Sequence, residues 1–407
     1  MNIIGRVDWL VVYNFDEVIE RKGTQSSKWD NVGARVGNQD ALPMWVADTD
    51  FRCPEPVVES TVERARHPIY GYSFVVPEFY DATIRWVKKQ HGWELKKEWL
   101  VFATGIVPVM NTMIQEYTEE GDEIIVQQPV YHPFGFAIHD NNRVLSNNQL
   151  VYKDGRYTID FENLERRTAS PKAKLMIICN PHNPVGRVWH EDELRQMGDI
   201  CVKNHVIMVI DEIHSDLVFK GNRHIPLASL DDAYARNSVT CYAPSKTFNC
   251  AGLRGSGLVV PNPEMKERLE QRFKRNRSIQ QSVFALPAYI AAYTQCDDYL
   301  EQLIPYLEGN AAYLDQFLKE NMPKIKLVKP EGTFLMWLDC SGLGRTPDEL
   351  ADFFINQCLV AISRGDGFGP SGGQFVRMNV GCPRSTVETA LNRIREHYES
   401  IDGGERI

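Results

Sequence analysis

The sequence lacks the features of disulfide-linked, nucleic-acid-binding and membrane-spanning proteins. Its 9 cysteines are scattered singly between Cys53 and Cys382 without a C-x-x-C pair, which excludes a disulfide framework or a zinc knuckle. Its 45 lysines and arginines are outnumbered by 54 acidic residues, so the net charge of −9 argues against nucleic acid or anionic lipid as the main partner. No apolar run approaches the roughly 18 residues that a membrane helix needs.

The beginning of the chain also lacks a secretion signal. Its longest apolar run, residues 9–13, is too short for a signal-peptide core. Together with the unpaired cysteines, this predicts a reducing, cytoplasmic location. His132, His182 and His190 do not have metal-ligand spacing, so no metal is expected. A small molecule is therefore the default ligand.

The composition is that of a globular chain of two or three domains. Hydrophobic residues make up 43% and charged residues 24% of the 407 positions, which is enough to bury a large core. Residues 1–60 contain glycines and prolines without a sustained period, and we expect an N-terminal arm with part of a small domain. Residues 61–297 form the expected large domain, and residues 298–407 a smaller α/β domain.

The large domain is predicted to contain a mostly parallel sheet covered by helices. Helical patterns such as residues 191–204 alternate with short β-branched runs, which is typical of an α/β fold with a buried parallel sheet. The predicted strands are residues 123–126, 175–179, 206–210, 239–242 and 258–260.

Polar residues follow three of these strands at the point where each strand ends. Asn180–Gly186, Asp211–His214 and Ala243–Lys246 come directly after apolar runs, and Arg254 follows eight residues after Lys246. The carboxyl ends of parallel strands meet at one edge of a sheet, where ligands bind. We therefore expect these side chains to share one site.

The residue types at this edge suit pyridoxal 5′-phosphate. A partly desolvated lysine, Lys246, can form a Schiff base with the cofactor's aldehyde. The Asp211 carboxylate can keep the pyridine nitrogen protonated, and Asn183 can donate to the ring oxygen. Ser245 and Arg254 are candidates for the phosphate.

Two further segments provide candidate cofactor contacts. Gly105 and Ile106 precede a helical pattern, and the free N–H groups of a helix N-terminus bind phosphate. Tyr131 follows the predicted strand 123–126 and could lie flat on the pyridine ring.

In order and spacing, these motifs resemble the fold-type-I pyridoxal-phosphate enzymes of the aminotransferase class I/II superfamily. Within it, the sequence is similar to the cystathionine β-lyases of MalY/PatB type, a carbon–sulfur β-lyase branch. The motifs that carry this narrower resemblance are Lys22–Thr24, Lys28–Asp30, Met44–Asp48 with Asp50 and Phe51, Tyr70–Tyr72 and Pro129–Phe134.

The resemblance implies roles for single residues. It makes Lys246, Asp211 and Tyr131 the catalytic residues, and it places Arg377 on the substrate α-carboxylate. Asn183 and Trp45 are the other substrate-binding candidates. It also implies that Tyr70 reaches the phosphate bound by a neighbouring subunit, so that two copies share their active sites as a homodimer.

The sequence departs from the family pattern at two positions. Many relatives have a phosphate-binding hydroxyl where this chain has Ala243, so Ser245 must supply that contact. Relatives often have tyrosine where His214 stands, which leaves His214 as a cofactor-binding candidate of undefined role.

The implied reaction is the α,β-elimination of L-cystathionine or another cysteine S-conjugate to a thiol, pyruvate and ammonia. Two alternatives stay open, the first because the same residues serve it and the second because the sequence does not exclude a regulatory protein contact on the surface. One is a pyridoxal-phosphate-dependent aminotransferase of class I/II, and the other is a pyridoxal-phosphate-binding regulatory protein. In each case the expected ligands are small molecules, with no nucleic acid and no membrane.

Overall fold

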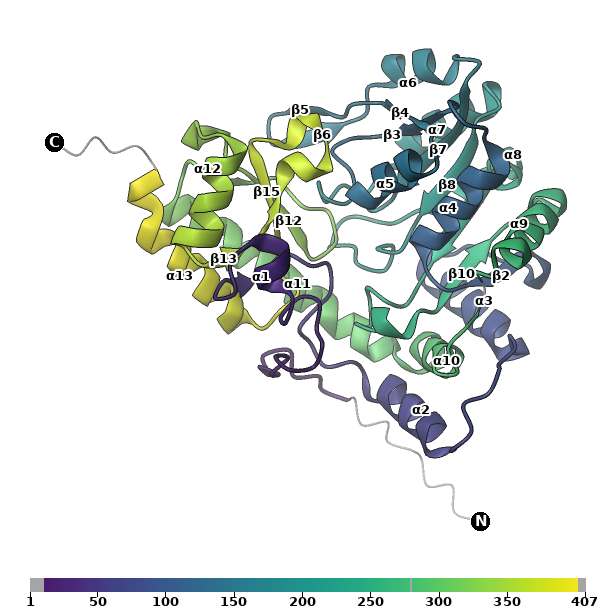
Figure 1. Ribbon diagram of the computed structural model, residues 1–407, viewed down its shortest axis with the longest axis horizontal. Helices are drawn as coiled ribbons and strands as arrows, with labels where there is room; N and C mark the ends of the chain where they lie inside the picture. The colour runs from purple at the N-terminus through teal and green to yellow at the C-terminus, as the bar shows by residue number, and fades with distance from the viewer. Residues whose placement is uncertain (1–10, 279, 402–407) are drawn as a thin grey trace.

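A seven-stranded sheet forms the centre of the larger half of the molecule (Figure 1). The computed structural model describes residues 11–278 and 280–401, so part of the apolar run at residues 9–13 lies outside the described residues. Strand β10 is antiparallel to both of its neighbours, whereas β3, β4, β7, β8 and β9 pair in parallel. In spatial order the strands are β2 (Leu100–Ala103), β10 (Ser256–Val259), β9 (Ser238–Tyr242), β8 (Ile207–Asp211), β7 (Ala173–Cys179), β3 (Glu123–Val126) and β4 (Val144–Asn147).

Both faces of this sheet are covered, as the continuous apolar runs predict. Alternate residues of β7 belong to different cores: Leu175 and Ile177 pack with one set of helices, and Met176 and Ile178 pack with the other. The first set is α4 (Ile106–Tyr117), α5 (His132–Asp140) and α9 (Pro263–Asn276). The second set is α6 (Phe161–Thr168), α7 (Glu191–Lys203) and α8 (Asp232–Arg236). The predicted α/β class is confirmed.

A four-stranded antiparallel sheet organises the smaller half of the molecule. Its strands are, in spatial order, β11 (Lys326–Leu327), β12 (Leu335–Asp339), β15 (Phe375–Asn379) and β14 (Ser363–Arg364). The accompanying helices are α11 (Asp297–Asn321), α12 (Pro347–Asp352) with a π-helical continuation over Phe353–Gln357, and α13 (Arg384–Ile401). The domain boundary expected after residue 297 falls at the first residue of α11.

The N-terminal segment joins both halves. Its strand β1 (Leu42–Pro43) pairs in parallel with β13 (Val360–Ala361), and its helix α1 (Val32–Val36) lies beside α12 in Figure 1. The expected boundary at residue 60 falls inside helix α2 (Glu55–Arg66). The prolines of residues 1–60 predicted an irregular chain, but proline is well tolerated in the first turn of a helix, where Pro56 stands.

The remaining elements connect these layers. Helices α3 (Pro77–His91) and α10 (Ala285–Gln295) pack against each other, and β5 (Val151–Lys153) pairs with β6 (Arg156–Thr158) as an antiparallel hairpin. Within residues 11–278 and 280–401, no helix has the length and apolar character needed to cross a membrane.

Candidate active site

The predicted site residues of the large domain lie at the carboxyl edge of neighbouring strands. Asp211 is the last residue of β8, and its Cα is in register with Cys179 of β7 and Cys241 of β9. The segment after β7 bends across this edge, because the backbone N–H of Asn180 donates to the Asp211 carbonyl at 3.0 Å. Lys246 stands four residues after the end of β9. The strand register therefore brings the lysine, the aspartate and the asparagine segment to one place.

The amine of Lys246 lies in a site that favours its neutral form. Its Nζ donates a hydrogen bond to the Ala47 carbonyl at 2.5 Å. Burial lowers the pKa of Lys246 to about 8, although the Asp48 and Asp211 carboxylates act in the opposite direction. A substantial fraction of this amine is therefore neutral near pH 8, as a nucleophile or a general base requires.

Asp211 is a buried carboxylate without an ion-pair partner in the described part of the chain. Burial raises its pKa to about 6, while the Ile213 N–H, which donates to Oδ1 at 3.1 Å, and the Lys246 charge oppose the rise. Such a group is costly to keep ionised unless a cation approaches it. Asp211 is thus suited to hold a protonated ring nitrogen.

Arg377 is a buried arginine without an anionic partner among the described residues. Its guanidinium donates to Asn183 Oδ1 at 2.9 Å, to the Trp45 carbonyl at 2.8 Å and to Ser363 Oγ at 3.1 Å, and it lies 4.9 Å from the centroid of the Phe368 ring. Its Nε has no hydrogen-bond partner there, and burial lowers its pKa to about 10. A carboxylate from a bound substrate would satisfy both the charge and the unpaired donor.

Tyr131 and His214 lie close to these charges. Burial raises the pKa of Tyr131, and the neighbouring Asp211 carboxylate adds to the effect. Burial and the positive charges of Lys246 and Arg377 hold the pKa of His214 well below its ordinary value, so this imidazole stays neutral. Its Nδ1 is buried and has no partner in the described part of the chain.

The predicted phosphate ligands form a less complete group. Gly105, at φ 151°, is the N-cap of α4, and Ile106 is the first residue of that helix, so N–H groups of the first turn are available. Ser245 is half-buried beside Lys246. Arg254 is exposed, and Tyr70 is exposed and donates to the Ala65 carbonyl at 2.5 Å. Within the described residues of one copy, neither of these last two side chains has a hydrogen bond or ion pair with the Asp211 cluster.

These residues fit pyridoxal 5′-phosphate, because several of their polar groups lack a partner that this cofactor would supply. The site has an amine of lowered pKa and a buried carboxylate that lacks a cation. Beside them stands a helix N-terminus begun by a glycine at positive φ. Each matches one functional part of the cofactor: its aldehyde, its ring nitrogen and its phosphate.

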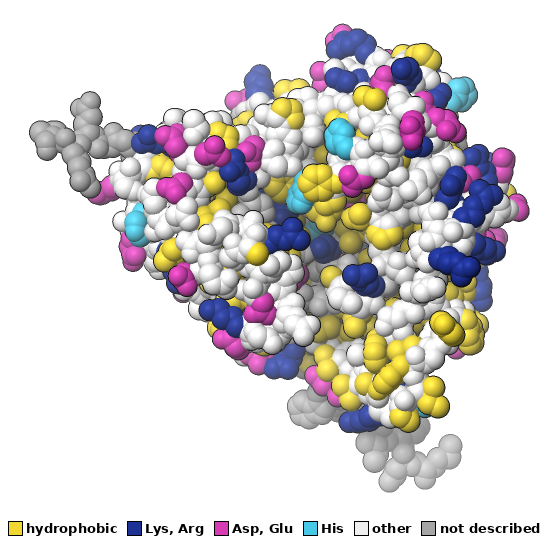
Figure 2. All heavy atoms as spheres, in the orientation of Figure 1, with side chains coloured by type: hydrophobic (Ala, Val, Ile, Leu, Met, Phe, Trp, Pro, Cys, Tyr) yellow, Lys and Arg dark blue, Asp and Glu magenta, His cyan; other side chains and the backbone are white. Residues whose placement is uncertain are grey.

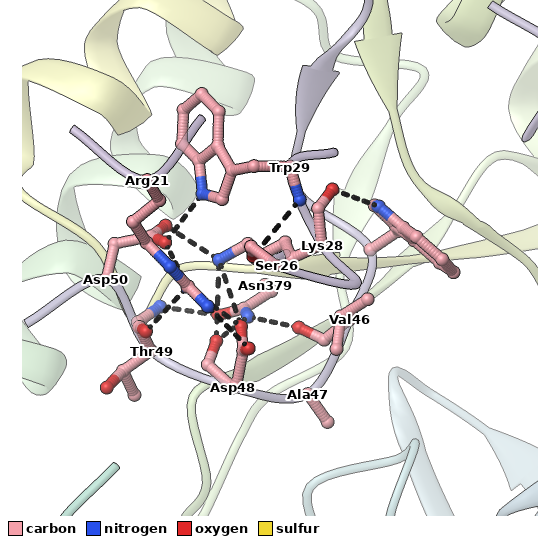
Figure 3. A network of polar contacts seen from close by, with 12 residues as sticks. Arg21, Ser26, Lys28, Trp29, Val46, Ala47, Asp48, Thr49, Asp50 and Asn379 are labelled. Atoms are coloured by element: carbon pink, nitrogen blue, oxygen red, sulfur yellow. Dashed lines mark hydrogen bonds and ion pairs between the residues drawn. The ribbon is translucent and has the colours of Figure 1, made fainter. Parts of the chain in front are cut away.

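The backbone of residues 45–48 crosses the site, a structural role that the sequence did not predict. We call residues 45–48 the strap (Figure 3). Consecutive strap carbonyls accept hydrogen bonds. Trp45 accepts from Arg377, and Ala47 accepts from Lys246. Asn379 donates to the carbonyls of Val46 at 2.5 Å and Asp48 at 2.6 Å (Figure 3). The strap thus contacts the two predicted reactive cations through its backbone.

A buried ion-pair cluster fixes the end of the strap. Lys28 is fully buried and donates to Asp50 Oδ2 at 2.7 Å. Arg21 binds Asp50 at 2.6 Å and Asp48 at 2.9 Å, and Trp29 donates to Asp50 at 2.9 Å (Figure 3). The Lys28 charge, opposing burial, contributes to a lowered pKa of Asp50. The sequence shows the charges of Lys28 and Asp50 but not their burial. Lysine and aspartate are rarely buried unless they are paired, so these charges were the only signal of the cluster.

A second polar cluster contacts Thr247, the residue after Lys246. The sequence did not predict this cluster either. Thr247 donates to Asp216 Oδ2 at 2.7 Å, and Trp86 donates to Asp216 Oδ1 at 3.0 Å. His91 Nε2 is 3.2 Å from Asp216 Oδ1. These contacts tie the residue that follows Lys246 to helix α3, which limits movement of the backbone that carries the amine.

We expect Asp211→Asn to stabilise the cofactor-free protein. The folded-state pKa of about 6 lies above the ordinary value of 3.8, so the wild type loses stability as pH rises through this interval and the variant does not. The gain should be about 1–3 kcal/mol above pH 6 and should fade below pH 4. Urea unfolding of both proteins at pH 4, 6 and 8 measures it. An equal difference at all three values would contradict the assignment of a buried, titrating carboxylate.

Comparison with known proteins decides the family. The model of the family "Aminotransferase class I and II" matches residues 48–394. The chain belongs to this family. Within it, the chain belongs to the branch of PatB and MalY. It is 42% identical to cystathionine β-lyase PatB of Bacillus subtilis, over 94% of this chain and 99% of the relative, and 33% identical to MalY of Escherichia coli, over 93% and 97%.

A solved structure supports the same placement. Cystalysin from Treponema denticola, whose crystal structure contains a pyridoxal 5′-phosphate cofactor, is similar to this chain with a TM-score of 0.93 and 32% identity. The similarity covers 96% of this chain and 100% of cystalysin. The family and the branch predicted from the motifs are therefore confirmed.

Proposed function

We propose that this chain is a pyridoxal-phosphate-dependent carbon–sulfur β-lyase that cleaves L-cystathionine or another cysteine S-conjugate. The observation that carries the proposal is that Lys246 and Asp211, at one edge of the large sheet, lie close to Arg377 of the small sheet. Each is buried or half-buried and lacks the partner that cofactor and substrate would supply. The similarity of this chain to PatB over nearly its whole length supports the choice of a lyase.

The cofactor, when bound, supplies an electron sink for the bond broken at the substrate's α-carbon. Lys246, Asp211, Asn183 and Tyr131 would hold its ring end. Gly105, Ile106 and Ser245 would hold its phosphate, with Arg254. His214 stays neutral beside the ring site and adds no charge to it.

The protein's own groups then position the substrate and move a proton. Arg377 holds the α-carboxylate, and its hydrogen bond to Asn183 fixes the guanidinium relative to the large domain. The Lys246 amine, with its pKa lowered by burial, accepts the α-proton at Nζ. The thiol leaves from the β-carbon, and water converts the remaining product to pyruvate and ammonia.

We also propose that the enzyme works as a homodimer with shared sites. The segment between α2 and α3 exposes Ile69, Tyr70, Tyr72 and Phe74. Figure 2 shows hydrophobic side chains gathered at the lower right of this face, over the region of α2 and α10. Burying such side chains against a second copy removes apolar area from water and would bring Tyr70 toward the partner's site. Sedimentation equilibrium tests this, and a monomeric mass would contradict it.

The function is tested by incubating purified protein and L-cystathionine with no keto-acid acceptor. We expect homocysteine, pyruvate and ammonia in equal amounts. Strict dependence on 2-oxoglutarate, with an amino-acid product formed from it, would identify an aminotransferase instead. Cofactor binding without either reaction would favour a regulatory protein.

A further inference from the structure

A cavity of about 580 Å³ opens beside Arg377, away from the cofactor residues. It lies between α1 and α12 of one side and α5 of the other, and Figure 2 shows a hollow between the two halves of the molecule. Ser363 and Trp45 line it, and both accept hydrogen bonds from the Arg377 guanidinium. A substrate whose α-carboxylate lies on Arg377 would therefore have this space next to it.

Part of the cavity wall is aromatic. It is lined by Trp45, His132 and Phe136. His132 packs edge-on against Phe368 at 5.6 Å between ring centroids, and the same Phe368 ring lies under Arg377. Burial and the Arg377 charge lower the pKa of His132 to about 4, so this wall carries no charge at neutral pH. Such a wall suits the methylene and sulfur atoms of a thioether chain.

The lining of the cavity also carries charges of both signs that have no ion pair within the described residues. Arg35 of α1 is exposed and has no ion pair there, and Asp352 of α12 accepts hydrogen bonds from Asn356 at 2.8 Å and Gln357 at 2.9 Å without a cationic partner. Arg364, by contrast, is already neutralised by Asp348 at 2.7 Å and Asp366 at 2.6 Å. One cation and one anion are thus left to face a ligand.

We infer that this cavity binds the distal amino-acid group of the substrate, with Arg35 on its carboxylate and Asp352 on its ammonium. The inference rests on the proposed lyase function and narrows it to thioethers that carry an amino acid at both ends. A conjugate with a short apolar leaving thiol would use the aromatic wall alone and gain nothing from these two charges.

The test compares L-cystathionine with S-propyl-L-cysteine, which has the same three-carbon chain on sulfur as far as the distal α-carbon but lacks the distal amino and carboxyl groups. Steady-state kinetics are measured for the holoenzyme, for Arg35→Ala and Asp352→Asn, and for Arg275→Ala, an exposed arginine on α9, as the matched control. We expect each cavity variant to lower kcat/KM for L-cystathionine about tenfold, mainly through KM, which corresponds to one charge-assisted hydrogen bond. The values for S-propyl-L-cysteine should change less than twofold.

Each outcome separates the inference from the function on which it rests. Equal losses with both substrates, or no loss with L-cystathionine, would overturn the cavity assignment while leaving the lyase intact. If the wild type released pyruvate from neither substrate, the proposed function itself would fail. If Arg275→Ala lowered kcat/KM for L-cystathionine as much as Arg35→Ala did, the loss would come from the change in overall surface charge. The assignment of Arg35 to the cavity would then be wrong.

Discussion

Replacing Lys246 with alanine is expected to reduce pyruvate formation by about 10⁴-fold or more, because one amine serves both to attach the cofactor and to move the α-proton. The wild-type amine has its pKa lowered to about 8, and no other lysine is described within the cluster around Asp211. Pyruvate release at saturating L-cystathionine measures the loss. The visible absorbance band of the bound cofactor should disappear in the same variant.

A matched control separates this effect from misfolding. Lys274, exposed on α9, is changed to alanine in parallel and should retain wild-type turnover. Both variants should give the circular dichroism spectrum of the wild type. A Lys246→Ala protein that remained active, with the visible band intact, would remove Lys246 from its proposed role.

The second large effect concerns folding and comes from Lys28→Met. Removing the buried ammonium leaves the Asp50 carboxylate with only part of its compensating charge, since Arg21 remains at 2.6 Å. Breaking a buried pair from one side costs about 3–5 kcal/mol. Urea unfolding followed by tryptophan fluorescence should show a loss of this order in the free energy of unfolding.

The double variant Lys28→Met with Asp50→Leu provides the comparison. It removes the uncompensated carboxylate together with its partner, so it should recover part of the lost stability. Its remaining deficit reports the loss of the Asp50 contacts to Trp29 and Arg21. If the free energy of unfolding of Lys28→Met lay within 1 kcal/mol of the wild-type value, the cluster would not be the anchor of the strap.

The sequence predicted the parts of the site that depend on strand order. Lys246, Asp211 and Asn183 could be placed together because each follows a strand of a parallel sheet, and parallel strands end at the same edge. The sheet and its covering helices followed from continuous apolar runs that alternate with helical patterns. These signals are local, and each can be recognised within about ten residues.

The parts that could not be predicted depend on contacts between distant segments. The Lys246 hydrogen bond to Ala47 joins residues 199 positions apart, and no periodic pattern in the sequence predicts it. The same holds for the cavity beside Arg377, whose lining comes from α1, α5 and α12. Tyr70 is exposed in one copy and donates to the Ala65 carbonyl, so its proposed role depends on a second chain.

The strap limits how independently the two halves of the molecule can move. Its Trp45 carbonyl binds Arg377 of the small sheet, and its Ala47 carbonyl binds Lys246 of the large one. Two residues of extended chain span at most about 7 Å, so these acceptors stay within that reach of each other. In the cofactor-free protein, a rotation of one half against the other must therefore either carry the strap along or break one of these two hydrogen bonds.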